Sequence, residues 1–331
     1  MLETNGLKFK TIDDYFLYIA ETLGYPHEIK EHFVSDVAFS DGLKIHLDIF
    51  EYAKEAPTVV FVPGTAIYSL CYAEFMYKLG KEGFNVVGFD PRGHGQSEGV
   101  RGDYTISEII RDTQSVITWA INRFNSNVSL MGSSQGGIVS FYTAAIDERL
   151  KGVTCQNFAD LTAPESLQLT KYPRLFKYMK KLLSKAGDIL PKTQIPVTSY
   201  IDLAQIPVRY FGNAKNFIES DPLTLKSISL RALQSLATTA LPKKVEEIKI
   251  PVMVFQGDAD NIFPISYTQQ IFHKITSKKK MTVFPNLTHA LVHENADEIL
   301  PEIVSWLHEI HDNPATSVLE TQLESTTKVN S

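Results

Sequence analysis

The segment that most constrains the fold of this chain runs from residue 128 to residue 145. An apolar run there ends in the pattern Gly132-x-Ser134-x-Gly136, and a stretch with helical character follows. A strand, a tight turn with Gly-x-Ser-x-Gly and a helix are together typical of a nucleophile elbow, which holds a serine in a strained conformation at the strand tip. The pattern therefore predicts an exposed, reactive serine at the end of a strand.

The glycine spacing also distinguishes between two adjacent serines. Side chains two residues before and after the nucleophile would collide with neighbouring backbone, so both positions need glycine. Ser134 has Gly132 and Gly136 at these positions, whereas Ser133 has glycine at neither. Ser134 is therefore the candidate nucleophile. For this stretch alone, a glycine- and serine-rich loop without chemistry remains the alternative.

Composition narrows the class of protein. With 331 residues, 44% hydrophobic and 21% charged, the chain has the composition of a globular protein with a sizeable core. A net charge of -6 and the lack of a basic block interleaved with aromatic residues argue against a nucleic-acid partner. The two cysteines, Cys71 and Cys155, are too few for a disulfide framework or a zinc site. We expect buried thiols and no bound metal.

The two ends of the chain carry separate expectations. No stretch approaches the length of a transmembrane helix, and the N-terminus lacks the pattern of a signal peptide, so a cytoplasmic protein is the simplest expectation. Residues 1–33 are predicted to be a helical extension, because apolar residues recur with helical spacing in 11–23. We expect it to pack on the main body or on a partner. Residues 313–331 are small and polar, which predicts a disordered tail.

The body of the chain alternates between short apolar runs and helical stretches, which predicts an α/β fold. Residues 34–39 and 43–50 have the pattern of an antiparallel hairpin. In addition to the elbow strand, buried strands are predicted at 58–62 and 85–89, and further strands at 152–158, 252–256 and 281–284. These eight segments predict a mostly parallel eight-stranded sheet flanked by helices.

The alternation breaks over residues 159–249, which divides the core into residues 34–158 and 250–312. This middle stretch follows the sixth predicted strand, and it is helix-like, rich in aromatic residues and interrupted by prolines. We expect it to be an insertion over the carboxyl ends of the strands, where open α/β sheets bind their ligands. The insertion is therefore predicted to be a helical lid.

A serine hydroxyl is a poor nucleophile and needs a base, usually histidine, that is oriented by a carboxylate. Partners of Ser134 should also follow strand ends, and both Asp260 and His289 do so. The order serine, acid, histidine is that of one particular hydrolase fold. Asp258 and Asp160, which also follow strands, remain alternative acids.

Further motifs occur in order along the chain. They are Pro63-Gly64-Thr65, Asp90-x-Arg92-Gly93-x-Gly95-x-Ser97, Gly132-x-Ser134-x-Gly136, Ser220-Asp221-Pro222-Leu223, Gly257-x-x-Asp260-x-x-x-Pro264 and Thr288-His289. In these motifs the chain resembles the α/β-hydrolase superfamily, and within it the monoacylglycerol lipase / serine aminopeptidase-like group of lidded esterases and lipases. The resemblance covers residues 34–311.

The resemblance implies a role for each motif residue. Ser134 would be the nucleophile, His289 the general base and acid, and Asp260 the carboxylate that orients His289. The backbone N–H groups of Thr65 and Gln135 would form the oxyanion hole.

Three of these motifs carry further expectations. The family often has His-Gly where this chain has Pro63-Gly64, so the geometry of that loop has to be established. Asp90, Arg92 and His94 belong to a motif that is expected to brace loops through a buried ion pair. The register of Gly-x-x-Asp-x-x-x-Pro favours Asp260 as the acid.

The resemblance implies hydrolysis of carboxylic esters through an acyl-enzyme on Ser134, without a cofactor. Residues 172–183 in the lid carry an apolar helical face, which favours medium-chain acyl esters or monoacylglycerol-like lipids as substrates. Within this face we expect Tyr172, Phe176 and Met179 to contact the substrate. An exposed part of the lid is expected to touch lipid surfaces transiently.

Other activities remain open at this point. A thioesterase would use the same residues, and an aminopeptidase would need an acidic pocket for a free amino terminus. Acidic residues available in the lid are Glu165, Asp188, Asp202, Glu219 and Asp221. A weakly catalytic small-molecule-binding module on a hydrolase scaffold is a further alternative. The sequence leaves the oligomeric state open.

Overall fold

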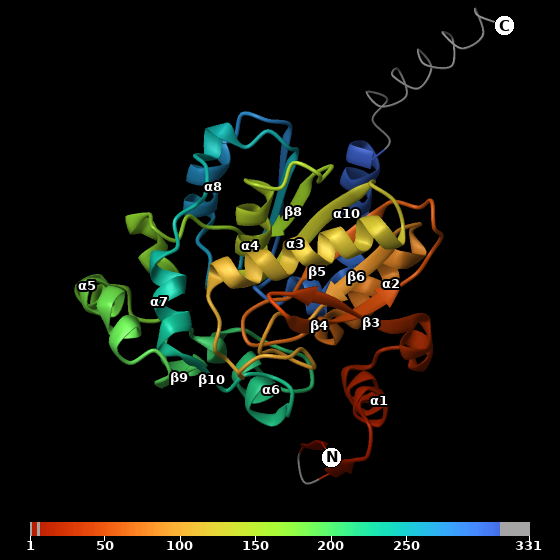
Figure 1. The fold of residues 1–331 in the computed structure, drawn as a ribbon, viewed down its shortest axis with the longest axis horizontal. Helices are drawn as coiled ribbons and strands as arrows, with labels where there is room; N and C mark the ends of the chain where they lie inside the picture. Colours follow the sequence, from red (N-terminus) through yellow and green to blue (C-terminus); the bar gives the residue numbers. More distant parts are fainter. Residues whose placement is uncertain (1, 5–6, 312–331) are drawn as a thin grey trace, which may run out of the picture.

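The computed structural model describes residues 2–4 and 7–311 and is built around one eight-stranded sheet (Figure 1). The order across the sheet is β12-β11-β8-β7-β5-β6-β4-β3. The strands are β3 (Phe33–Ser40), β4 (Leu43–Phe50), β5 (Thr58–Val62), β6 (Asn85–Phe89), β7 (Val128–Ser133), β8 (Val153–Gln156), β11 (Val252–Gly257) and β12 (Lys279–Phe284). Only β4 pairs in antiparallel fashion, with β3 and with β6. The predicted mostly parallel eight-stranded sheet is confirmed.

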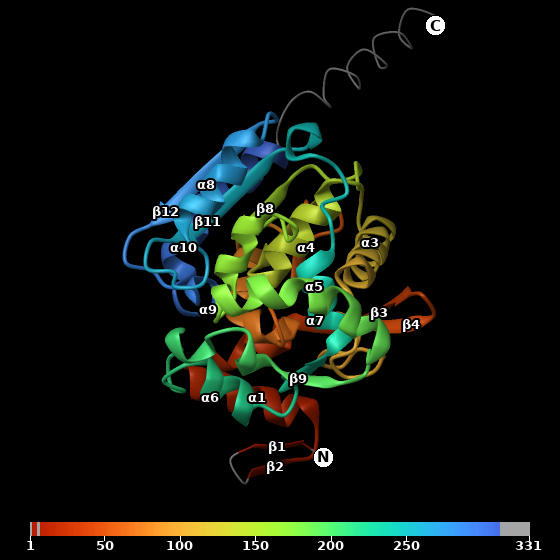
Figure 2. The ribbon, with the colours of Figure 1, turned by 90° about the vertical axis from the view of Figure 1, so that its left-hand side faces the viewer.

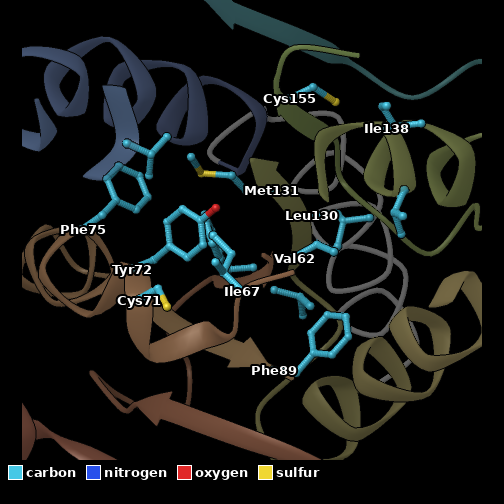
Figure 3. Close-up of a cluster of buried hydrophobic side chains, with 14 of the residues drawn as sticks. Val62, Ile67, Cys71, Tyr72, Phe75, Phe89, Leu130, Met131, Ile138 and Cys155 are labelled. Atoms are coloured by element: carbon cyan, nitrogen blue, oxygen red, sulfur yellow. The ribbon is translucent and has the colours of Figure 1, made fainter. Parts of the chain in front are cut away.

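The central strands are covered on both faces. Every residue of β5, β6, β7, β8 and β11 is buried. Parallel strands between two helical layers need continuous apolar runs, and the sequence has these runs at the five strands. Figure 3 shows the result at β7, where Leu130 and Met131 point to opposite faces of the sheet.

Helices form a layer on each face of the sheet (Figure 1). They are α2 (Ala73–Lys81), α3 (Ile106–Arg123), α4 (Gln135–Ala144), α8 (Ile265–Lys274), α9 (Leu291–Glu294) and α10 (Ala296–His311). Helix α2 packs on α10, and α3 packs on α4 across the sheet from them (Figure 3). A capping box starts α3: Thr105 Oγ1 accepts from Glu108 N, and the Glu108 carboxylate accepts from Thr105 N.

Residues 157–251 form an insertion between β8 and β11. Its main elements are the 3-10 helix η3 (Pro164–Leu169), α5 (Pro173–Ile189), β9 (Gln194–Pro196), α6 (Ala214–Ser220), β10 (Ser227–Ser229) and α7 (Leu230–Thr238). Strands β9 and β10 pair with each other, a small sheet that the sequence analysis did not predict. Helix α5 packs on α7, and α7 contacts α3 of the core, so the insertion is anchored to the main body.

The N-terminal extension packs on the body of the molecule. It consists of β1 (Leu2–Thr4), β2 (Leu7–Phe9), α1 (Ile12–Leu23) and the 3-10 helix η1 (His27–His32). Tyr15 and Phe16 on α1 are buried, and Figure 2 shows α1 beside α6 of the insertion. The strand pair was not predicted. The tail predicted at residues 313–331 lies outside the described residues.

Candidate active site

Ser134 lies in the sharp turn between β7 and α4, in a backbone conformation that non-glycine residues rarely adopt (φ 56°, ψ -118°). The flanking glycines allow the turn to pack closely. A Cβ atom on Gly132 would lie 2.2 Å from the carbonyl oxygen of Gly136, and one on Gly136 would lie 2.1 Å from that of Val62. The glycine spacing in the sequence therefore has a steric cause.

Three side chains from different strand ends form one hydrogen-bonded row. Nε2 of His289 lies 2.9 Å from Oγ of Ser134, and Nδ1 of His289 lies 2.9 Å from Oδ2 of Asp260. The other carboxylate oxygen of Asp260 accepts from the backbone N–H groups of Ile262 and Phe263, at 2.8 and 3.0 Å. The Phe263 ring also stacks on the imidazole, at 5.6 Å between centroids. Asp260 and His289 are thus both held in a fixed orientation.

The charge of Asp260 determines which nitrogen of His289 carries hydrogen. Burial acts to raise the pKa of Asp260, but interaction with His289 and the two backbone N–H groups lowers it below its usual value overall. An ionised carboxylate can only accept, so Nδ1 is the N–H donor to it. Nε2 of the neutral ring is then the acceptor for the Ser134 hydroxyl. This arrangement is able to take a proton from the serine.

The structure places the alternative acids elsewhere. Oδ1 of Asp258 accepts from the backbone N–H of Asn286, and Asp258 is exposed. Oδ1 of Asp160 accepts from the N–H and hydroxyl of Thr162, at 2.9 and 2.7 Å. Only Asp260 of the three contacts His289.

The adjacent serine has a different partner. The Ser133 hydroxyl donates to Oε1 of Gln156, whose Nε2 donates to the backbone carbonyl of His289 at 2.6 Å. Gln156 therefore keeps Ser133 away from the imidazole and ties the elbow to the loop that carries His289. The sequence analysis missed Gln156. Its position at the end of β8, next to β7, was the available signal.

Thr65 and Gln135 lie together at the cavity that Ser134 faces. Thr65 Oγ1 donates to Gln135 Oε1 at 3.1 Å, which joins the loop after β5 to the start of α4. Among the described residues, neither backbone N–H of this pair has a hydrogen-bond acceptor. Such free N–H groups next to a nucleophile are able to bind a developing oxyanion.

The loop that contains Thr65 is held on both sides of that residue, although it has proline where the family often has histidine. Gly64 N donates to the hydroxyl of Tyr72 at 3.1 Å. Ala66 has a positive φ of 67°, and its carbonyl accepts from Leu225 N of the insertion at 2.8 Å. The insertion therefore holds the loop in a conformation that alanine alone disfavours.

Ser134 and His289 open into an apolar cavity of about 200 Å³. Its walls come from the core, the insertion and the N-terminal extension. The apolar lining from the insertion comprises Leu161, Leu167, Leu169, Ile201, Leu203, Ile206, Val208, Ala214, Phe217, Ile218, Leu233, Leu236 and Ala237. A cavity of this kind fits an acyl chain better than a charged group.

A family model described as "Serine aminopeptidase, S33" matches residues 53–296, which is most of the chain. The chain belongs to this family. The bounds of the match include the elbow, Asp260, His289 and the whole insertion, and leave out the N-terminal extension.

Individual relatives agree with this assignment. The monoacylglycerol lipase of Mycolicibacterium smegmatis is 23% identical over 258 residues, which cover 75% of this chain and 87% of that enzyme. The bifunctional esterase/perhydrolase DCH of Acinetobacter calcoaceticus is 21% identical over 267 residues, 77% of this chain and 92% of that one. The crystal structure of the monoacylglycerol lipase of Paleococcus ferrophilus has a TM-score of 0.65 and 26% identity, and the match covers 80% of this chain and 99% of that one. The predicted membership in the monoacylglycerol lipase-like α/β-hydrolases is confirmed, and the protein is a hydrolase.

The structure places Tyr172, one of the three predicted substrate contacts, away from the cavity wall. Tyr172 is 50% exposed, is not part of the cavity wall and lies beside Lys171, whose Nζ is 5.7 Å from the ring centroid. Helix α5 begins at Pro173, so Tyr172 lies just before the helix and not on its apolar face. Helical spacing showed which residues share a face, but not which way that face turns. The side chains of Phe176 and Met179 lie outside the described residues.

Arg92 forms the ion pair that was predicted to brace the loops of this α/β-hydrolase. Its carboxylate partners lie outside the Asp90-x-Arg92 motif. Arg92 bonds to Asp112 on α3, with Nη2 at 2.6 Å from Oδ1, and to Asp41 at 2.8 Å. Asp90 instead accepts from the backbone N–H groups of Ser69 and Gln96, both at 2.8 Å. Arg92 therefore ties the loop after β6 to α3 and to the β3–β4 turn.

Two further findings concern the whole described part of the chain. Within residues 2–4 and 7–311, no group of three or more His, Cys, Asp or Glu side chains is placed to hold a metal ion. In the same residues, no helix has both the length and the apolar character to cross a membrane.

Proposed function

We propose that the protein hydrolyses carboxylic esters, namely medium-chain acyl esters or monoacylglycerol-like lipids, through an acyl-enzyme on Ser134. The observation that carries this proposal is the hydrogen-bonded row of Ser134, His289 and Asp260 at the wall of an apolar cavity. The lipases and esterases among its relatives support the same chemistry.

The proposed reaction is acyl transfer in two steps. His289 takes the proton of the Ser134 hydroxyl as the oxygen attacks the ester carbonyl, and Asp260 stabilises the imidazolium that forms. The N–H groups of Thr65 and Gln135 bind the oxyanion. The imidazolium then protonates the leaving alcohol, and water repeats the sequence to release the acid. No cofactor or metal takes part.

The insertion acts as a lid in this proposal. Its apolar residues form much of the cavity wall, so they exclude water from the acyl chain and select for apolar substrates. On its outer side, α5 exposes Leu175 and Tyr178, which are 53% and 84% exposed, beside the exposed cations Arg174 and Lys177. Exposed apolar and basic side chains on one helix favour transient contact with an anionic lipid surface.

The lid contact has its own test. Tyr178→Ser and Leu175→Ser should lower the rate on an ester presented in anionic phospholipid vesicles and leave the rate on a short, dissolved ester unchanged. Val100→Ser, which removes an exposed apolar side chain (68% exposed) outside the insertion, is the matched control. Equal losses on both substrates would contradict a role at the lipid surface.

An aminopeptidase is the second candidate, and Glu294 is the observation that favours it. Among the described residues, Glu294 is the only carboxylate that lines the cavity, and none of the five lid acids considered from the sequence does so. Glu294 already accepts from Arg209 N at 3.0 Å and lies 3.5 Å from the Arg209 guanidinium. Because this charge is already paired, the site fits an uncharged ester better than a free amino terminus.

The test is hydrolysis of p-nitrophenyl esters from acetate to palmitate by the wild type, Ser134→Ala and Ser133→Ala. We expect an optimum at medium chain length, a loss on the order of 10⁴-fold in Ser134→Ala, and a loss below about tenfold in Ser133→Ala. Amino-acid p-nitroanilides and acyl thioesters are measured in parallel. Turnover of only the anilides would refute the esterase proposal in favour of an aminopeptidase, and turnover of only the thioesters in favour of a thioesterase. If no substrate is turned over, the remaining interpretation is a small-molecule-binding module on a hydrolase scaffold.

A further inference from the structure

The N-terminal extension reaches the substrate cavity, although it lies outside the residues that match the family model. Its residue Tyr25 lines the same cavity as Ser134 and is buried. Tyr25 follows α1 closely in the chain. The helix ends at Leu23 and is capped by Gly24, which has a φ of 73°. Gly24 allows the left-handed turn that closes the helix, and Tyr25 N donates to Ala20 O at 2.7 Å.

A buried carboxylate ties the extension to the rest of the molecule. The Tyr15 hydroxyl on α1 donates to Oδ2 of Asp221, and the Tyr68 hydroxyl in the core donates to the same oxygen at 2.9 Å. Asp221 belongs to the insertion, where its other oxygen accepts from Leu223 N and Thr224 N, at 2.7 and 3.1 Å. One side chain thus joins the extension, the core and the insertion.

A second contact lies at the end of α1. A Cβ atom on Gly24 would lie 3.0 Å from the hydroxyl oxygen of Tyr210, so the turn before Tyr25 packs closely on the insertion. Phe16 on α1 and Ile29 after it are also buried. Helix α1 is therefore held at both of its ends, and Tyr25, which follows it, has little freedom to leave the cavity wall.

We propose that Tyr25 is a specificity-determining residue, whose ring limits the size of the substrate that the cavity accepts. The Tyr15–Asp221–Tyr68 bonds hold the extension, and with it the ring, in place. The proposal rests on the ester hydrolysis proposed above. It assigns part of the cavity wall to a residue that lies before residues 53–296, the segment that the family model matches. The cavity has a volume of about 200 Å³, and the aromatic ring at its wall takes up room that a larger acyl or alcohol group would need.

The experiment uses the full chain and two series of esters, one with a fixed alcohol and growing acyl chains and one with a fixed acyl group and growing alcohols. Tyr25→Ala removes the ring, Tyr25→Phe keeps it, and Leu17→Ala changes an exposed residue of the preceding helix α1 (40% exposed). For each variant kcat and KM are measured separately, and thermal unfolding shows that the protein is folded.

We expect Tyr25→Ala to raise the ratio of kcat/KM for large over small esters about tenfold in one of the two series, mainly through a lower KM for the large esters. Tyr25→Phe and Leu17→Ala should keep the wild-type ratios. A folded Tyr25→Ala variant that loses activity by the same factor on every ester would overturn the proposal, because a purely structural residue behaves in that way.

Two further measurements keep the outcomes separate. If Tyr25→Ala does not fold, Tyr25→Leu takes its place, and an unchanged size profile in that variant overturns the proposal. Ser134→Ala is included on both series. Its loss of activity together with unchanged Tyr25 profiles refutes only the role of Tyr25. Full activity in Ser134→Ala refutes the proposed acyl-enzyme on Ser134, and a wild type that hydrolyses no ester of either series refutes the proposed ester hydrolysis itself.

Discussion

Nδ1 of His289 lies 2.9 Å from Oδ2 of Asp260, although 29 residues separate the two in the chain. The side chain of Asp260 is fully buried, whereas Asp258, two residues earlier, is exposed and bonds to Asn286 N. Among the described residues, Asp260 is therefore the one carboxylate partner of the imidazole.

Replacing Asp260 should stop the reaction with little change in structure. In Asp260→Asn the amide is able to donate to Nδ1, which moves the ring hydrogen to Nε2 and removes the acceptor for Ser134. We expect kcat to fall on the order of 10⁴-fold. Asp258→Asn is the matched control and should stay close to the wild type. Steady-state kinetics on one ester decide the matter, and comparable losses in both variants would refute the assignment of the acid.

The elbow glycine Gly136 should not tolerate a side chain. In Gly136→Ala the new Cβ would lie 2.1 Å from the carbonyl oxygen of Val62 and 2.5 Å from that of Pro63, and both are backbone atoms. We expect the free energy of unfolding to fall by about 3 kcal/mol or more, as for other overpacked sites. Urea denaturation measures this loss.

Gly212→Ala is the control for that substitution. Gly212 also has a positive φ, 76°, but the nearest atom to its added Cβ is 3.8 Å away. The cost should be only the left-handed conformation, about 1–2 kcal/mol. Equal losses at the two glycines would mean that steric contact with β5 is not the cause.

Removing Arg92 should leave a buried charge without its partner. The Asp112 side chain is fully buried and lies 2.6 Å from Nη2 of Arg92. We expect Arg92→Met to lower the free energy of unfolding by about 3–5 kcal/mol. Arg111→Met breaks a more exposed pair with Asp41 and should cost less than about 1 kcal/mol. The double variant with Asp112→Leu should regain most of the loss in urea denaturation, and no recovery would contradict an electrostatic cause.

Stability should depend on pH through His94. Burial lowers the pKa of His94 to about 4, and its Nδ1 bonds to the carbonyl of Arg92 at 3.0 Å. Between pH 6.5 and 4 the unfolded chain binds a proton here that the folded chain does not. This contribution to stability is complete above pH 6.5 and declines by about 1.4 kcal/mol per pH unit as the pH falls through that window.

The variant His94→Asn isolates this effect. Buried carboxyl groups such as Asp90 and Asp221, whose pKa values are raised chiefly by burial, act in the opposite direction, so the wild-type slope is a sum. The difference between the wild-type and variant slopes, measured by urea denaturation from pH 7 to pH 4.5, belongs to His94. Parallel curves would show that His94 does not stay neutral in the folded protein.

The sequence and the structure agree best where the pattern is local. Continuous apolar runs predicted the parallel strands, because a strand buried on both faces needs apolar side chains at every position. The spacing of Gly132 and Gly136 predicted the elbow, because the glycines meet backbone within the same turn and the neighbouring strand. Both patterns lie within a few residues of the feature they determine.

Contacts between distant segments could not be read in this way. Helical spacing in residues 172–183 correctly indicated a helix, yet it could not show that Tyr172 would face solvent. Nothing in the sequence near Tyr15 points to Asp221, which is 206 residues away. The strand pair β9–β10 and the place of Tyr25 in the cavity wall were missed for the same reason.

The sequence by itself determined the strands, the elbow, the candidate nucleophile and the family, because steric and hydrophobic patterns act over short stretches of chain. It also favoured Asp260 over Asp258 and Asp160 as the acid. The tertiary structure alone decided which carboxylate meets His289, which side chains form the cavity and how the extension reaches it. Those outcomes depend on which distant segments pack against each other. Such packing leaves no periodic pattern in the sequence of either segment.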